Sequence, residues 1–304
     1  MTSVVFFGTP EEAVPTLHEL AARHDVRLVV TQPDRPKGRS ARPQPPPVKL
    51  EAERLGIEVA QPAKAPDLLQ VVRSKGPFDL GVVVAYGRIL RREVLEVPEH
   101  GILNVHFSLL PRWRGAAPVA RALMAGDTMT GVTIIRLDEG LDTGPVLTAQ
   151  LVDIHPSEDA GRLTERLAHL GARLLVSVIP GYLSGEIVPV PQTDEGVTYA
   201  EKLTAEDRPL AGIDDAAEFL ARVRGLAPDP GAVLVIDGEA HKVLAARIDG
   251  DPPQTGVWEL RDGFPVVAVG GKGVALVKIQ PPGGRPMAGD AWARGRRRER
   301  GAVG

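Results

Sequence analysis

The chain of 304 residues contains no cysteine. This absence excludes disulfide bonds, thiolate metal sites and cysteine nucleophiles together, and it is compatible with a reducing compartment. No apolar run approaches the roughly 20 residues that a membrane-spanning helix requires. Residues 1–7 include no basic segment of the kind that opens a secretory signal. We therefore expect a cytoplasmic protein that makes no membrane contact.

A strong excess of charge of either sign is also absent. The formal net charge is −3 at pH 7, so any contact with nucleic acid would depend on local basic patches and not on the global field. Two such patches exist, at residues 34–42 and 294–300. Each can also be read as a solvated charge run, and a run at a chain terminus is often disordered.

Familiar cofactor motifs are missing as well. Gly8-Thr9-Pro10 forms a tight turn after the first predicted strand but lacks the later glycines of the dinucleotide fingerprint, and the chain has no P-loop. It also has no H-E-x-x-H pair, and its seven histidines are scattered. The sequence therefore predicts no metal site and disfavours an NAD-dependent oxidoreductase.

The first half of the chain alternates short apolar runs with helical patterns, which is typical of βαβ units and a parallel sheet. Strands are predicted at residues 4–7, 26–31, 80–85, 101–106, 130–136 and 146–154. Helices are predicted at residues 11–23, 48–55, 68–74, 119–125 and 159–183. Ligands of such α/β sheets bind beyond the carboxyl ends of the strands, so the loop after residue 106 is the place to look for chemistry.

The pattern changes near Gly185. Residues 187–192 are held extended by prolines and indicate a linker. A helix is predicted at residues 214–225, and short strands follow at residues 233–236, 241–246, 256–260, 264–269 and 274–279. Turn signals such as Asp237-Gly238 separate them. The second half therefore predicts a compact β-barrel such as an OB-like fold.

Two polar side chains share one face of the strand predicted at residues 101–106. Because side chains alternate along a strand, Asn104 and His106 point to the same side, about 6.6 Å apart at roughly 3.3 Å per residue. Asp142 follows in a glycine-flanked segment, where it could orient the histidine or merely cap a turn. An amide, a histidine and a carboxylate suffice for acyl transfer without a serine or cysteine nucleophile.

The residues around these side chains resemble a known family. The segment from Asn104 to Pro118 reads N-V-H-F-S-L-L-P-R-W-R-G-A-A-P, and Thr130-Gly131-Val132-Thr133 and Gly140-Leu141-Asp142-Thr143-Gly144 follow it. This pattern is similar to that of the formyltransferases that use 10-formyltetrahydrofolate. Residues 31–39, 84–87 and 198–203 further resemble the members that act on methionyl-tRNA. The resemblance covers nearly the whole chain.

The resemblance implies a Rossmann-like, mostly parallel formyltransferase domain at residues 1–188, a linker at 189–207 and an OB-like tRNA-binding domain at 208–304. Its catalytic residues fall on Asn104, His106 and Asp142. Its folate-binding residues fall on Arg88, Ile89, Leu90, Ser108, Leu109, Leu110 and Pro111. Its tRNA-reading loop falls on residues 32–47, with Arg35, Lys37, Arg39 and Arg42. The expected protein is a monomer that uses 10-formyltetrahydrofolate and initiator methionyl-tRNA, and neither a metal nor DNA.

Some features depart from the family and leave alternatives open. Residues 206–214 lack the Asp-Trp pair common in the family, and residues 225–231 lack its usual aromatic residue. A formyltetrahydrofolate hydrolase would share the triad but would not need the basic loop and the barrel. A sugar-nucleotide formyltransferase would differ in the amine that accepts the formyl group, so testing amine acceptors would distinguish it. An RNA-binding module without catalysis would leave Asn104, His106 and Asp142 unexplained.

Overall fold

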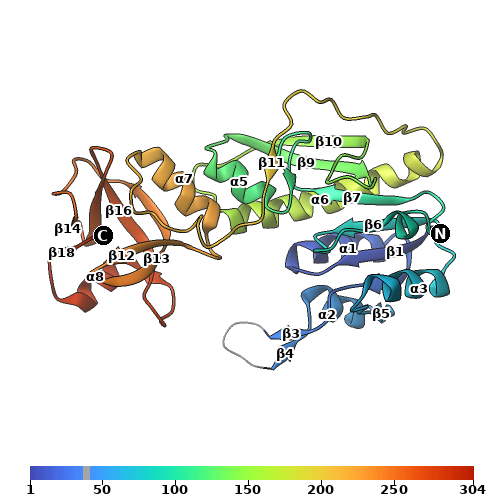
Figure 1. Cartoon of the computed structure of the whole chain (residues 1–304), viewed down its shortest axis with the longest axis horizontal. Helices are drawn as coiled ribbons and strands as arrows, with labels where there is room; N and C mark the ends of the chain where they lie inside the picture. Colours follow the sequence, from blue (N-terminus) through green and yellow to red (C-terminus); the bar gives the residue numbers. More distant parts are fainter. Residues whose placement is uncertain (37–41) are drawn as a thin grey trace. The chain divides into compact units, whose positions relative to one another are not determined.

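The computed structural model describes residues 1–36 and 42–304 (Figure 1). Lys37 and Arg39, which the resemblance assigns to tRNA, lie outside the described residues. The chain forms two compact units. The first comprises residues 1–116, 130–152 and 164–200, and the second comprises residues 117–129, 153–163 and 201–304. No described helix is both long and apolar enough to span a membrane.

In the described part of the chain, the first unit contains a seven-stranded sheet with the order β10-β9-β7-β6-β1-β2-β5. The strands are β1 Ser3–Gly8, β2 Asp25–Val30, β5 Val59–Ala60, β6 Leu80–Val84, β7 Ile102–His106, β9 Met129–Arg136 and β10 Val146–Asp153. The neighbours from β5 to β7 pair in parallel, and β9 pairs antiparallel with β7. The predicted mostly parallel sheet is confirmed.

Prolines mark where several helices of this unit begin. Pro15, Pro47 and Pro66 each lie in the first turn of a helix, where the missing N–H would have no intrahelical acceptor and the fixed φ suits the helix. The helices are η1 Glu11–Ala13, α1 Val14–Ala21, α2 Pro47–Arg54, α3 Ala65–Lys75, α4 Arg92–Leu95 and α6 Ala160–Leu183. The helix predicted at residues 11–23 is thus divided into a 3₁₀ turn and α1.

The strand order reverses beside β1. From β1 the chain adds β2 and β5 on one side, and it then returns to add β6 and β7 on the other. Ligands of open α/β sheets bind beyond the carboxyl ends of strands at such a reversal. Residues 9–10, 85–90 and 107–113 follow the carboxyl ends of β1, β6 and β7. The fold therefore brings the candidate segments to one edge of the sheet.

The second unit is built on a curled antiparallel sheet with the order β12-β13-β16-β15-β14-β18, and β17 pairs with β16. Its strands are β12 Ala232–Ile236, β13 Glu239–Ile248, β14 Val257–Arg261, β15 Phe264–Val269, β16 Lys272–Gln280, β17 Met287–Ala288 and β18 Arg300–Ala302. Its helices include α5 Pro118–Met124, α7 Ala216–Leu226 and α8 Gly289–Arg296. The predicted OB-like architecture is confirmed.

The basic segment at residues 294–300 lies partly in regular secondary structure. It contains the end of α8 and the first residue of β18, which pairs with β14. Trp292 is 3% exposed, and its ring meets the Trp258 ring edge to face at 5.3 Å. Burial of these aromatic rings holds the helix on the sheet, because an aromatic side chain contributes a large apolar area.

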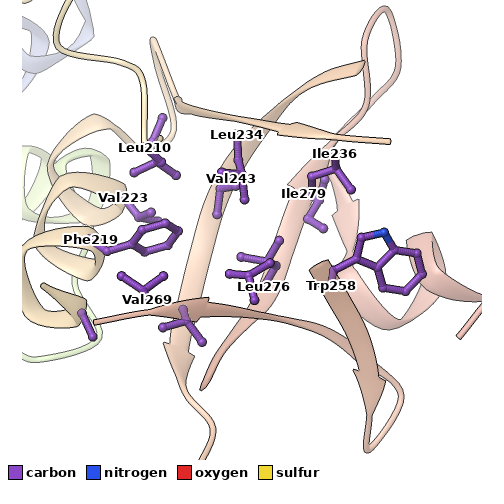
Figure 2. Close-up of a cluster of buried hydrophobic side chains, with 14 of the residues drawn as sticks. Leu210, Phe219, Val223, Leu234, Ile236, Val243, Trp258, Val269, Leu276 and Ile279 are labelled. Atoms are coloured by element: carbon purple, nitrogen blue, oxygen red, sulfur yellow. The ribbon is translucent and has the colours of Figure 1, made fainter. Parts of the chain in front are cut away.

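One apolar cluster stabilises the second unit (Figure 2). Phe219 and Val223 of α7 point toward Val243, Leu276 and the other side chains of the sheet. The side chain of Asp215 caps α7 by accepting a hydrogen bond from Glu218 N at 2.8 Å, which satisfies one of the free N–H groups of the first turn. The cap and the apolar face together fix this helix against the barrel.

Replacing the aromatic centre of this cluster is expected to destabilise the second unit strongly. Phe219 is 1% exposed, and Phe219→Ala should lower the free energy of unfolding by about 3–5 kcal/mol, since the truncation loses buried area and leaves a cavity. Val235→Ala is the control, because Val235 lies in the same unit but is 38% exposed. Its effect should stay near 0.5 kcal/mol. Urea unfolding of both variants measures the difference, and equal midpoints would contradict the proposed packing.

Candidate active site

Strand β7 carries two of the three predicted catalytic residues. Asn104 and His106 are 9% and 5% exposed and sit two residues apart, so they share a face of the strand. In the antiparallel pairing with β9, Asn104 lies opposite Ile135 and His106 lies opposite Thr133. A buried strand between two neighbours gives both side chains a fixed backbone, which is the rigid support that a catalytic group needs.

Asp142 reaches both residues from the loop at residues 137–145. Its Oδ1 accepts a hydrogen bond from Asn104 Nδ2 at 3.3 Å, and its Oδ2 lies 3.6 Å from His106 Nδ1. The backbone of Asp142 is left-handed, with φ at 53°, a conformation that aspartate tolerates better than most residues. Gly144 allows the loop to fold back, because a Cβ there would stand 1.9 Å from Arg136 O. The three predicted residues are therefore together in space.

Both ring nitrogens of His106 face oxygen atoms that can accept a hydrogen. His106 Nε2 lies 2.9 Å from Trp113 O, and a carbonyl oxygen can only accept, so Nε2 carries a proton. His106 Nδ1 faces the Asp142 carboxylate, which also only accepts when ionised. At 3.6 Å this second contact is too long for a hydrogen bond. A proton on Nδ1 would therefore remain available to a ligand.

The loop at residues 107–115 is tied to the neighbouring strand. The Ser108 hydroxyl donates to Arg112 O at 2.6 Å, and the Thr133 hydroxyl donates to Ser108 O at 2.7 Å. Thr133 Oγ1 also accepts from Leu110 N at 3.1 Å. Ser108 is fully buried, so its hydroxyl closes the turn that presents the next residues, Leu109 to Pro111. The loop also supplies Gly115 N, which donates to Asp142 Oδ2 at 2.8 Å.

The predicted folate segment after β6 contains residues with three different surroundings. Arg88 Nη1 donates to Pro62 O at 3.1 Å. Leu90 is 5% exposed and packs in the core of the unit. Ile89 is 81% exposed. An exposed branched side chain at the carboxyl edge of a parallel sheet is a surface that an apolar ring can cover.

The predicted tRNA loop begins and ends in a short hairpin. Strand β3, Arg35–Pro36, pairs antiparallel with β4, Pro43–Gln44, and both are exposed. Arg42 is exposed beside it. Asp34 anchors the base of the hairpin, and its hydrogen bonds from Gln61 and Lys49 hold the pKa of its carboxyl below the usual value. Of the predicted tRNA residues, Arg35 and Arg42 are described.

The segment at residues 190–200, which we name the strap, contacts the site at residues 192 and 198–200. Strand β11, Tyr199–Ala200, pairs in parallel with β8, Arg114–Gly115. Gly115 has φ at 123°, and a Cβ there would stand 2.6 Å from Ala200 O, so this close approach requires glycine. These contacts leave no signal in the sequence, because two-residue strands have no periodicity and the prolines before them indicate a linker. Among the described residues, no group of histidine and carboxylate side chains could hold a metal ion.

Family models match most of the chain. A model described as formyl transferase matches residues 1–179, and one described as the formyl transferase C-terminal domain matches residues 202–297. Similar proteins include the methionyl-tRNA formyltransferase of Halorhodospira halophila, 48% identical over 97% of this chain and 96% of that protein. Another is the methionyl-tRNA formyltransferase of Cereibacter sphaeroides, 42% identical over 99% of this chain and 98% of that protein.

Solved structures share the fold at low sequence identity. The HypX structure from Aquifex aeolicus in complex with tetrahydrofolic acid superposes with a TM-score of 0.67 at 17% identity, covering 96% of this chain and 46% of that one. The sugar 3N-formyl transferase WlaRD gives a TM-score of 0.66 at 16% identity, covering 90% of this chain and 97% of that one. These likenesses support the architecture described above.

Proposed function

Since the chain belongs to the formyl transferase family, we propose that it transfers the formyl group of 10-formyltetrahydrofolate to the α-amine of initiator methionyl-tRNA. The observation that carries this proposal is the convergence of Asn104, His106 and Asp142 on one buried strand and its facing loop. Relatives named methionyl-tRNA formyltransferase align with almost the full chain. Charged tRNA and folate occur together where translation takes place, so we place the activity in the cytoplasm.

The described residues fit a folate at the carboxyl edge of the sheet. Ile89 offers an exposed apolar surface after β6, and Leu109 to Pro111 follow His106 on the neighbouring strand. We propose that Arg88 to Leu90 and Ser108 to Pro111 hold the folate, with Ser108 and Leu90 shaping the backbone from inside. When bound, 10-formyltetrahydrofolate supplies an activated formyl group. No metal is required for this chemistry, because nitrogen-to-nitrogen acyl transfer needs hydrogen-bond donors and a route for one proton.

The reaction forms a bond between the amine nitrogen and the formyl carbon and breaks the bond from that carbon to folate N10. Negative charge grows on the formyl oxygen meanwhile and needs preorganised donors. Asn104 uses one amide hydrogen on Asp142 and has a second for this oxygen. Protonated His106 offers Nδ1–H, while its Nε2–H stays on Trp113 O and holds the ring in place. Both donors then contribute to lowering the barrier.

Asp142 has two roles in this mechanism. Its Oδ2 faces His106 Nδ1 at 3.6 Å and so helps to orient the ring that donates to the formyl oxygen. It can also accept the proton that the amine loses, directly or through water, and this proton then passes to folate N10 as N10 leaves. The amine is itself the nucleophile, so no covalent enzyme intermediate forms. Gly115 N and Asn104 Nδ2 keep the carboxylate aimed at the histidine throughout.

The decisive experiment supplies 10-formyltetrahydrofolate together with methionyl-tRNA and follows the labelled formyl group. Initiator methionyl-tRNA, elongator methionyl-tRNA and a water-only reaction form the three arms. Formylation of the initiator species supports the proposal. Release of formate without any acceptor would instead indicate a hydrolase, and formylation of a small amine with neither tRNA modified would overturn the tRNA assignment.

We further propose that the basic loop at residues 32–47 contacts the tRNA backbone through Arg35, Lys37, Arg39 and Arg42. Two observations support this proposal. Arg35 lies exposed in the hairpin of β3 and β4, and guanidinium groups bind phosphate oxygens through paired donors. The anchoring of Asp34 by Gln61 and Lys49 holds the base of the hairpin on the sheet unit.

Arg35→Ala is expected to weaken the use of tRNA selectively. The KM for charged tRNA should rise about 3- to 10-fold, while the KM for 10-formyltetrahydrofolate stays unchanged, and the salt slope of tRNA binding should fall by about one unit because one phosphate contact is lost. Arg92→Ala is the control, since Arg92 is exposed on α4 and bonded to Glu96. If the parent and Arg35→Ala have the same KM for charged tRNA and the same salt slope, Arg35 does not contact the tRNA.

A further inference from the structure

We propose that Gln192 is a positioning residue of the reaction, which acts by holding the loop that carries Asp142; this inference rests on the proposed function. Gln192 Nε2 donates to Asp142 O at 2.7 Å and to Gly144 O at 2.8 Å. Its Oε1 accepts from Arg114 Nε at 3.1 Å and Nη2 at 2.7 Å. One amide thus uses both of its hydrogens and both of its lone pairs.

These bonds fix the carboxylate from two ends. The carbonyl bonds hold the backbone of Asp142 itself and of Gly144. At the other end, Arg114 precedes Gly115, and Gly115 N donates to Asp142 Oδ2 at 2.8 Å. Gln192 and Arg114 therefore connect the backbone of Asp142 to Gly115, whose N–H holds the Asp142 carboxylate. Asp142 has φ at 53°, a strained conformation for a residue with a Cβ, and such a residue needs partners to keep it in place.

The same strap holds the partner of His106. Thr198 Oγ1 accepts from Trp113 N at 2.8 Å, and Thr198 O accepts from Arg114 N at 2.9 Å. Trp113 in turn supplies the carbonyl that lies 2.9 Å from His106 Nε2. Upstream, Val190 exchanges both backbone hydrogen bonds with Val146 at 2.8 Å. The strap is therefore anchored on both sides of Gln192, and its amide has a defined position.

An amide is the side chain that these partners demand. Arg114 is 7% exposed, and the Gln192 oxygen accepts from its Nε at 3.1 Å and its Nη2 at 2.7 Å. A neutral oxygen at residue 192 satisfies two of its donors without adding a charge next to Asp142. Glutamate would pair with Arg114 but would face the carbonyls of Asp142 and Gly144 with acceptors only. The Gln192→Glu substitution thus keeps the contact with Arg114 and loses the hydrogen bonds to the carbonyls of Asp142 and Gly144.

The test compares Gln192→Glu and Gln192→Met with the parent and with Thr193→Ala. Thr193 is a neighbouring, exposed strap residue whose hydroxyl only accepts from Glu195 N. Both Gln192 variants should lower kcat about 10- to 100-fold, the range for displacing a catalytic group by about 1 Å. The KM for 10-formyltetrahydrofolate should change by less than 2-fold, and Thr193→Ala should keep the parental kcat. A Gln192→Glu enzyme with parental kcat would overturn the proposal.

A double-variant cycle separates positioning from general support of the fold. If Gln192 acts through Asp142, then Gln192→Met should lower kcat at most about 2-fold in an Asp142→Asn background, because effects on one functional unit are not additive. An equal fold-loss in both backgrounds would overturn the proposal. Hydrogen exchange gives a second readout that needs no activity: amides of residues 138–145 should exchange faster in Gln192→Met than in Thr193→Ala. Unchanged exchange there would count against it equally.

The proposed function and this inference fail in different ways. The parent enzyme, assayed with 10-formyltetrahydrofolate and initiator methionyl-tRNA, tests the function without any variant. The ratio of variant to parent, together with the exchange of residues 138–145, tests Gln192. If the parent formylates the tRNA and both Gln192 variants have the parental kcat, the proposed function holds and the positioning role of Gln192 is wrong.

Discussion

His106→Ala and Asn104→Ala are each expected to lower kcat by about two to three orders of magnitude, the range for losing one oxyanion donor or one general acid. Each residue is buried on β7, and in the proposed mechanism each donates one hydrogen bond to the formyl oxygen. Binding of folate should persist, because neither side chain belongs to the segments proposed to hold it. Single-turnover formylation and folate titration measure the two quantities separately.

The matched control for these variants is His169→Ala, which removes an exposed histidine of α6 from the same unit. Its single-turnover rate should equal that of the parent within about 2-fold, as expected for a surface substitution away from the site. Near-parental rates in His106→Ala or Asn104→Ala would mean that the oxyanion is stabilised elsewhere. The proposed mechanism would then be wrong even if the enzyme formylates tRNA.

Asp142→Asn should lower the rate by about 100-fold or more, comparable to the loss of a general base in other enzymes. The amide has nearly the shape of the carboxylate and keeps one acceptor for Gly115 N, so the fold should survive. It removes the carboxylate that faces His106 Nδ1 at 3.6 Å and that is proposed to accept the proton of the amine. Rates measured from pH 5.5 to about 9 show whether this loss persists at every pH.

Asp138→Asn provides the comparison in the same loop. The Asp138 carboxylate accepts from Gly140 N at 3.1 Å and from the Thr143 hydroxyl at 2.7 Å, and these bonds only close the turn. Its rate should stay within about 3-fold of the parent, since an asparagine oxygen can accept the same bonds. If Asp142→Asn were as mild as Asp138→Asn at every pH, Asp142 would be a turn residue without a chemical role.

The sequence predicted the arrangement of Asn104 and His106 because strand periodicity is a local property. Two residues on one buried strand share a face whatever the rest of the fold does. The approach of Asp142 could not be predicted from spacing, since it depends on the left-handed backbone at Asp142 and on the close passage of Gly144 past Arg136. Asp142 was predicted only from the family resemblance. The geometry of its loop explains how its carboxylate comes to lie beside Asn104 and His106.

The strap and α8 were not predicted from the sequence, and both omissions have physical reasons. The strap makes its contacts through Gln192, Thr198 and a two-residue parallel pairing, none of which leaves a pattern in one sequence. In α8 only three of the eight residues are buried, Gly289, Trp292 and Ala293, and only one of them is a large apolar side chain. A helix of eight residues is too short for a reliable apolar period. Tertiary burial decided its structure.

The division of the chain into units restricts how this architecture can be rearranged. Helix α5 is placed in the sequence between strands of the first unit, yet it packs in the second, where a Cβ on Gly225 of α7 would stand 2.8 Å from Ala120 O. Arg121 of α5 also pairs with Asp207 at 2.6 Å. A chimera that joins a foreign C-terminal half after residue 200 would therefore place a mismatched α7 against the host α5. When C-terminal halves are exchanged between relatives, residues 117–129 and 153–163 must therefore be exchanged together with them.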